Sequence, residues 1–115
     1  MARPEEMEEA GRISIAKDVV STIAALAAAE IPGVFAPSGE PFPRGPAARR
    51  HVETELLGGR VRVSLRIAVE YGRAVPEVVQ ELQEKIKAEV ERMTALPVEA
   101  VDVEVTRVVF SEEQS

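Results

Sequence analysis

The sequence predicts an α+β two-layer sandwich in which both helices cover one face of a small mixed sheet. Two segments carry apolar residues at helical spacing, and others alternate apolar and polar residues as strands do. Their order along the chain is short strand, helix, strand, strand, helix, strand. With 115 residues the chain has room for one domain. We therefore expect a single domain over residues 11–110, preceded by a disordered acidic tail (1–10) and followed by a short tail (111–115).

The N-terminal half predicts a short edge strand, a helix and a long loop. Residues 11–15 alternate around Ile13 and Ile15, and the helix spans about residues 16–30. Five alanines between Ala24 and Ala29 let this helix approach a sheet closely. The breakers of residues 32–50 exclude a regular helix or a central strand, so this segment is expected to be a loop. The expected apolar stripe of the helix is Val19, Ile23, Leu26 and Ala27, widened by Val20, Ala24 and Ala28.

A β-hairpin is the firmest structural prediction. Gly58-Gly59 separates two alternating segments, and glycines suit the positive φ angles of a two-residue hairpin turn. The second strand, Arg60 to Tyr71, places Val61 and every second residue through Tyr71 on the buried side. A slip of one residue would break the pattern on both faces. The expected cross-strand pairs are Leu56 with Val61, Thr54 with Val63, Val52 with Leu65, and Glu55 with Arg62.

The C-terminal half predicts a second helix and a last strand. Val75-Pro76 opens the helix, with proline at the first helical position, and Leu96-Pro97 ends it. The strand follows over residues 98–110, and its alternation shifts phase near Arg107, which indicates a β-bulge. The expected buried stripe of the helix is Val79, Leu82, Ile86, Val90 and Met93.

The composition argues against most catalytic and metal-binding chemistry. The chain has no cysteine, which excludes thiolate nucleophiles and disulfides, and its single histidine, His51, follows two arginines that should lower its pKa. No P-loop or dinucleotide-binding glycine pattern occurs, and the carboxylates do not converge as metal ligands would. We therefore expect no enzyme activity, no catalytic residue, no cofactor and no metal site, and we interpret His51 as a surface residue.

The charge pattern bears on possible partners. A net charge of −6 disfavours nucleic acid and direct adhesion to anionic lipid, and neither a signal peptide nor a membrane-spanning segment is expected. The sequence does not explain the basic cluster Arg44, Arg49 and Arg50. The outer sheet face is the best candidate interaction surface, through face-to-face or edge-to-edge pairing with a second copy, and the alternative is a plain solvated face. Its predicted members are Arg60, Arg62, Arg66, Glu53, Glu55, Asp102 and Glu104.

Four short motifs stand out along the second half of the chain: Val69-Glu70-Tyr71-Gly72, Pro76-Glu77-Val78-Val79 and Met93-Thr94-Ala95-Leu96, followed by Val101-Asp102-Val103. In this order and spacing they resemble the alkaline shock protein family of envelope-stress proteins. The resemblance covers roughly residues 12–109, apart from the loop. The sequence departs from the family at Ala95 and Asp102, where members often have Gly and Asn, and in its proline-rich loop.

The resemblance implies a non-enzymatic cytoplasmic protein linked to envelope stress. Some family members self-associate and are held at the membrane by a separate anchor protein. The family has no established catalytic residues, so the resemblance implies none here. Two other functions stay open at this point: a small regulatory subunit of a soluble enzyme, for example in lipid metabolism, and an RNA-binding module.

Overall fold

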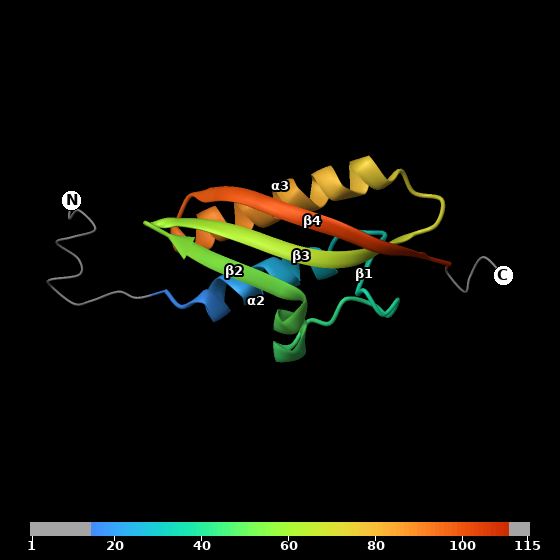
Figure 1. Cartoon of the computed structure of the whole chain (residues 1–115), viewed down its shortest axis with the longest axis horizontal. Coiled ribbons are helices and arrows are strands. Elements are labelled where there is room, and N and C mark those ends of the chain that lie inside the picture. Colours follow the sequence, from blue (N-terminus) through green and yellow to red (C-terminus); the bar gives the residue numbers. More distant parts are fainter. Residues whose placement is uncertain (1–14, 111–115) are drawn as a thin grey trace, which may run out of the picture.

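The computed structural model describes residues 15–110 and has the predicted α+β architecture. A four-stranded sheet forms one layer and two helices form the other (Figure 1). The predicted tails and the predicted strand at 11–15, except Ile15, lie outside the described residues. The elements in chain order are α2 (Lys17–Ala29), β1 (Val34–Phe35), the 3-10 helix η1 (Pro46–His51), β2 (Val52–Leu57), β3 (Arg60–Glu70), α3 (Val75–Thr94) and β4 (Val98–Val109).

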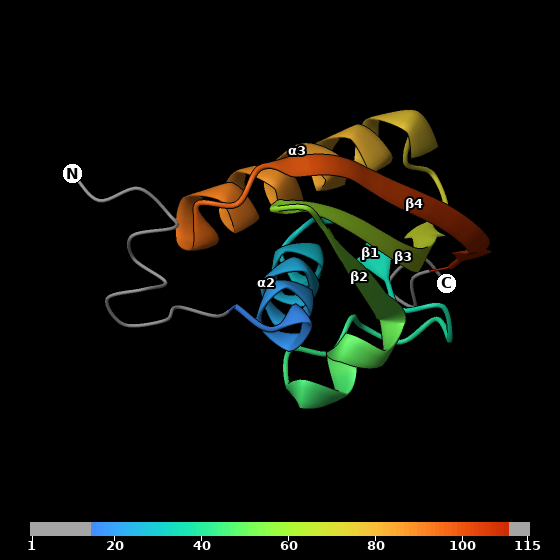
Figure 2. The ribbon, with the colours of Figure 1, turned by 60° about the vertical axis from the view of Figure 1, so that its left-hand side comes forward.

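Strand β3 is the centre of the sheet. One of its edges pairs with β4 in parallel, and its other edge pairs antiparallel with β2 and, further along, with β1. The sheet is therefore mixed, as predicted. Helix α3 provides the crossover that a parallel β3–β4 pair requires, and Figure 2 shows it running beside β4 while α2 lies alongside β2.

The hairpin register is the predicted one at every pair. Leu56 lies opposite Val61, and Glu55 lies opposite Arg62. Gly58 and Gly59 have φ angles of 58° and 86°, which only glycine adopts without steric cost. The turn chemistry and the alternating pattern thus agree on one register.

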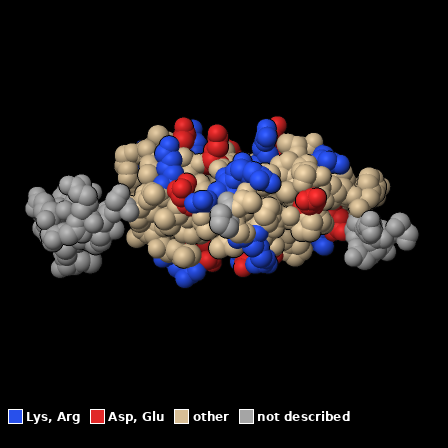
Figure 3. All heavy atoms as spheres, turned by 90° about the horizontal axis from the view of Figure 1, so that it is seen from below, with Lys and Arg blue, Asp and Glu red and all other residues tan. Residues whose placement is uncertain are grey.

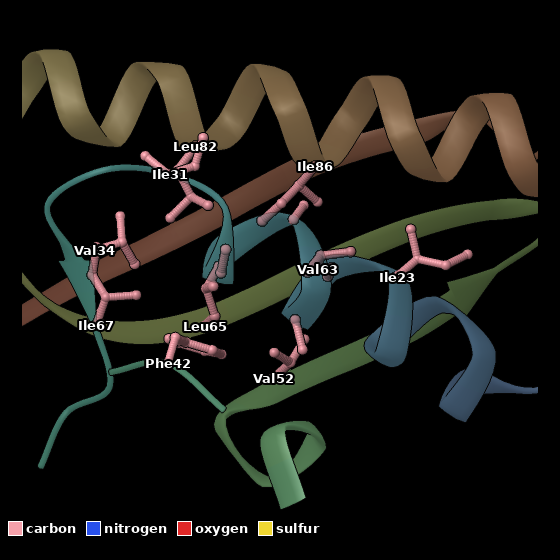
Figure 4. Close-up of a cluster of buried hydrophobic side chains, with 14 of the residues drawn as sticks. Ile23, Ile31, Val34, Phe42, Val52, Val63, Leu65, Ile67, Leu82 and Ile86 are labelled. Carbon is pink, nitrogen blue, oxygen red and sulfur yellow. The ribbon is translucent and has the colours of Figure 1, made fainter. Parts of the chain in front are cut away.

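The core lies between the sheet and the two helices. Val61, Val63, Leu65 and Ile67 of β3 are buried, and Figure 4 shows the last three on the side of the sheet that faces α2 and α3. The small side chains of α2 allow close contact: most of its alanines are buried. One polar pair is enclosed with them, because the hydroxyls of Ser21 and Thr54 lie 2.8 Å apart and satisfy each other's hydrogen-bonding needs.

Residues 32–50 are more ordered than the sequence predicts. Strand β1 pairs with the end of β3, and η1 begins with a proline, the position at which a helix tolerates that residue. Phe42 is buried and contacts His51 edge-to-face at 5.6 Å. The segment therefore has neither a regular helix nor a central strand, as expected, but the sequence did not predict these two short elements, which are too short to show periodicity.

Four predicted core side chains are exposed, Val19 among them at 47%. Met93 and Tyr71 are each 59% exposed, and Leu26 is 37% exposed. Tyr71 lies beyond the end of β3 and stacks on Phe110 at 4.8 Å, so it no longer faces a helix. In α3 the buried row follows a spacing of four residues and begins one residue earlier than expected: Val78, Leu82, Ile86 and Val90.

The C-cap of helix α3 is Ala95, one of the positions where the sequence departs from the family it resembles. Ala95 has a φ of 63°, in the left-handed region that glycine adopts most readily. Its backbone N–H still donates to the carbonyl of Glu91. Alanine at this position therefore keeps the helix end but carries a steric cost that glycine would avoid.

Candidate functional site

The outer sheet face lies opposite the helix layer and faces the viewer in Figure 1. It is open over the hairpin but closed at its far end, where the guanidinium of Arg107 donates to the carbonyl oxygen of Ser38 at 3.2 Å. Ala68, on the same side of β3, is fully buried there. The structure places all the predicted interaction residues on the open part: Glu53 and Glu55 from β2, Arg60, Arg62 and Arg66 from β3, and Asp102 and Glu104 from β4.

The charges on this face follow the strands. The carboxylates come from the two flanking strands and the guanidiniums from the central one. The register sets Glu55 beside Arg62, and Arg66 beside Glu104. A positive row therefore runs between two negative rows. Among the residues that the structure describes, Arg66 and Glu104 form no ion pair, so their charges remain available to a partner.

The sequence analysis missed Glu99, which anchors the other two arginines. The Arg62 guanidinium donates to its carboxylate at 3.2 Å, and Arg60 Nε lies 3.7 Å from its second oxygen. The register of β3 and β4 shifts between Val61 and Arg62, so Glu99 has no direct strand partner and can reach both arginines. The alternation of the last strand gives no sign of this first irregularity. The second one, near Arg107, was predicted and is confirmed.

A shallow depression of about 520 Å³ occupies the middle of the face. It extends from β4 across β3 to the end of η1. Burial lowers the pKa of the His51 imidazole, and the nearby guanidiniums of Arg50 and Arg66 lower it further. The lowered pKa was predicted, but burial rather than neighbouring charge is its main cause. The depression is lined by Arg50, His51, Glu53, Ser64, Leu65, Arg66, Asp102, Val103 and Glu104.

His51 makes the stability of the fold depend on pH. Its pKa is lower in the folded state than the value of about 6.5 expected when unfolded, so the unfolded chain takes up the proton first. The free energy of unfolding should therefore fall as pH decreases below about 6.5 and level off below the folded pKa. Urea denaturation between about pH 7.5 and 5.5 tests this. His51→Gln should flatten that part of the curve; an unchanged slope would contradict the assignment.

The predicted basic cluster does not form one site. Arg49 pairs with Asp18 of α2 at 3.2 Å, whereas Arg50 lines the depression on the outer face and Arg44 is exposed. Figure 3 shows Lys and Arg side chains gathered near the middle of the face viewed from below, with acidic residues among them. Neither arrangement produces a continuous basic groove of the kind that nucleic-acid binding uses.

Residues 15–110 hold neither a metal-ligand cluster nor a membrane-spanning helix. Their His, Asp and Glu side chains form no group of three that could hold a metal ion. None of the helices described here has the length and apolar character needed to cross a bilayer.

Comparison with known proteins gives one family match. The family model for alkaline shock proteins, described by a "cell envelope-related function", matches residues 5–110. An uncharacterized protein of Bacillus subtilis strain 168, YqhY, is 26% identical over 107 residues, which cover 87% of this chain and 78% of that protein.

The solved structures found include several variants of the MamM CTD. One variant is 19% identical with a TM-score of 0.48, and covers 78% of this chain and 95% of its own. A zinc form of another is 19% identical with a TM-score of 0.46, and covers 85% and 89%.

Proposed function

The chain belongs to the alkaline shock protein family, described by a cell envelope-related function, and from this premise we propose that it is a non-enzymatic interaction protein. It associates with further copies of itself through the outer sheet face. A membrane-anchored partner then holds the assembly at the envelope. The observation that carries this proposal is the alternation of charge across the open face, with a positive row on β3 between negative rows on β2 and β4.

This alternation is self-complementary when two faces meet with an offset. Neighbouring strands lie about 4.8 Å apart. If two copies face each other about a two-fold axis parallel to the strands, and are displaced by one strand, β3 of each lies over β4 of the other. Arg66 of one copy then meets Glu104 of the second, and the same contact repeats in the opposite sense. Such an interface is isologous, as in most homodimers.

The edge of β4 offers a way to extend such an assembly. Within the described residues β4 pairs only with β3, so its second edge has no strand partner. Side chains protect the start of this edge: Gln83 donates to the carbonyl oxygen of Val101, and Glu91 accepts from the N–H of Val98. An exposed strand edge is a surface on which another strand can pair unless it is blocked. The later part of β4 is therefore a second contact between copies.

Recruitment by a partner fits the charge of the chain. With a net charge of −6, the protein is repelled by the anionic headgroups of a bacterial inner leaflet. A partner protein that supplies the membrane attachment would overcome this repulsion. Self-association would strengthen that attachment, because each further copy adds a binding event at high effective concentration.

Sedimentation velocity combined with affinity capture tests the proposal. The full chain should form dimers or larger species as its concentration rises from about 1 µM to 1 mM. Capture from separately solubilised membrane and soluble fractions should recover a membrane-anchored protein in stoichiometric amount. A strictly monomeric chain, together with recovery of a soluble enzyme alone, would contradict the proposal and favour a regulatory subunit.

A further inference from the structure

An apolar groove of about 440 Å³ lies between α2 and α3, in the helix layer. The two helices run antiparallel: Glu30 after the end of α2 pairs with Lys85 in the middle of α3 at 3.2 Å, and Met93 near the end of α3 lines the groove with Val19 near the start of α2. The groove therefore follows α2 along its length and is bounded on its other side by the C-terminal half of α3.

The groove is lined by apolar side chains, of which Ile23 and Ala27 are buried and the others are exposed. Val19, Ile23 and Leu26 lie on one side of α2 at the spacing of successive turns, and Met93 faces them from α3. Val19 to Leu26 covers about 10 Å of helix, which is two turns. The sequence pattern marks Val19, Leu26 and Met93 as core residues, yet all three are exposed. Apolar side chains gathered in this way on a surface indicate a contact site.

The rim of the groove is mainly acidic. Asp18, Glu30 and Glu89 line it, whereas Arg49 is its only basic lining residue among those described. Each carboxylate has one ion-pair partner: Arg49 at 3.2 Å, Lys85 at 3.2 Å and Arg92 at 2.7 Å, respectively. Asp18 and Glu30 nevertheless keep 74% and 50% of their side-chain surfaces exposed, so a second cation can reach their oxygens.

We propose that this groove binds an amphipathic helix of a partner protein, with apolar residues at positions i, i+3 or i+4, and i+7, flanked by lysine or arginine. Helices bind apolar grooves through this spacing of anchors, and the basic flanks match the acidic rim. Cytoplasmic segments next to membrane spans are rich in Lys and Arg. Such a helix next to the anchor's membrane span is therefore the occupant, and this identification rests on the proposed function above.

The charges disfavour an occupant from this chain. The segment before α2 carries Glu5, Glu6, Glu8 and Glu9, which the rim would repel. The exposed aromatic Phe110 of a second copy is followed closely by Glu112 and Glu113, which the rim would also repel. An anionic lipid surface meets the same opposition.

Fluorescence anisotropy of three labelled helical peptides tests this inference with the full-length chain. All three have the same leucine and alanine content. The first has leucines at the anchor positions and lysine flanks, and the second has the same anchors with glutamate flanks. The third is the lysine peptide with its leucines scrambled, so that they leave the anchor positions. The lysine peptide should bind at least tenfold more tightly than the other two. Equal binding of all three, or no binding up to about 1 mM, would overturn the inference.

Leu26→Ser and Leu57→Ser form a matched pair of variants. The two leucines are 37% and 39% exposed, but only Leu26 lines the groove. Leu26→Ser should weaken binding of the lysine peptide about tenfold, and Leu57→Ser should leave it unchanged. Asp18→Asn should weaken binding of the lysine peptide and should not weaken binding of the glutamate peptide. Equal losses in both serine variants would overturn the assignment.

Two further measurements identify the occupant and separate this inference from the proposed function. If Leu26→Ser abolished self-association, or abolished binding to vesicles of phosphatidylglycerol, the occupant would be a second copy or lipid and the inference would fail. If affinity capture recovered a membrane protein as well with Leu26→Ser as with the unaltered chain, the proposed function would stand, but the groove would not be the binding site for that protein. Peptide binding without any captured membrane protein would support the groove and contradict the membrane partner.

Discussion

Ile67→Ala is expected to lower the free energy of unfolding by about 3 kcal/mol, the largest effect of any single change considered for this chain. Ile67 is fully buried in the middle of the central strand, and its cross-strand partner is Val105 of β4. Figure 4 shows it beside Val34, on the side of the sheet that faces the helices. Truncation removes apolar contacts and leaves a cavity in the core, which the paired strands and the helices packed on them keep from collapsing fully.

Urea denaturation followed by circular dichroism measures this loss. The midpoint should fall while the slope with urea stays constant, because the extent of the folded structure is unchanged. Leu57→Ala, an exposed position next to the hairpin turn, is the matched control and should change stability by less than about 0.5 kcal/mol. A loss below about 1 kcal/mol for Ile67→Ala would show that the core is not centred on β3.

Arg66→Glu is expected to weaken self-association roughly thirtyfold. In the proposed offset dimer Arg66 meets Glu104 of the second copy, and the two-fold axis repeats the contact. Reversing one charge turns both attractions into repulsions. At about 0.5 kcal/mol for each exposed attraction and a similar cost for each repulsion, the total is about 2 kcal/mol. The change should also depend on ionic strength, because exposed charges are screened by salt.

Lys87→Glu provides the control for net charge. It makes the same change in charge but lies on α3, in the helix layer, with a long exposed pair to Glu91 at 3.8 Å. Sedimentation equilibrium of the two variants separates a local contact from a general effect of charge. Equal weakening in both would indicate that net charge alone controls association, and the outer sheet face would lose its role.

The parts of the fold that the sequence predicts well are those in which two independent patterns agree. The Gly58-Gly59 turn and the alternation on both sides of it specify one register, and every predicted pair forms. The order of helices and strands follows from periodicity over long segments. By contrast, β1 and η1 are short and lie among prolines, so no periodicity marks them, and only their pairing and packing partners define them.

Burial at the ends of elements was harder to predict. Tyr71 continues the apolar pattern of β3 but lies beyond the end of the strand and stacks on Phe110. Met93 continues the apolar pattern of α3 but lines the open groove between α2 and α3 and stays exposed. Val19 and Leu26 are exposed for a related reason: α2 is apolar around more of its circumference than the sheet and α3 together can bury. A sequence pattern identifies an apolar side chain and not the surface that covers it.

Most members of the candidate site could be placed on one face from strand alternation alone, because side chains alternate between the two faces. Glu99 could not, since it reaches that face through a bulge at the start of β4. The contribution of His51 and Arg50 to the depression was also missed, because it depends on how η1 leads into β2. The groove between the helices depends on tertiary packing that periodicity does not specify.

The most direct measurement of self-association through the outer sheet face is sedimentation equilibrium of Arg66→Glu, Glu104→Arg and their equimolar mixture. Each variant alone should associate weakly, because like charges meet in its dimer. The mixture should recover an affinity close to that of the unaltered chain. In the mixed dimer the glutamate introduced into one variant meets the arginine introduced into the other, while the native Arg66 and Glu104 form the second contact. If the mixture associates no better than either variant alone, β3 of one copy does not face β4 of the next, and the proposed assembly is contradicted.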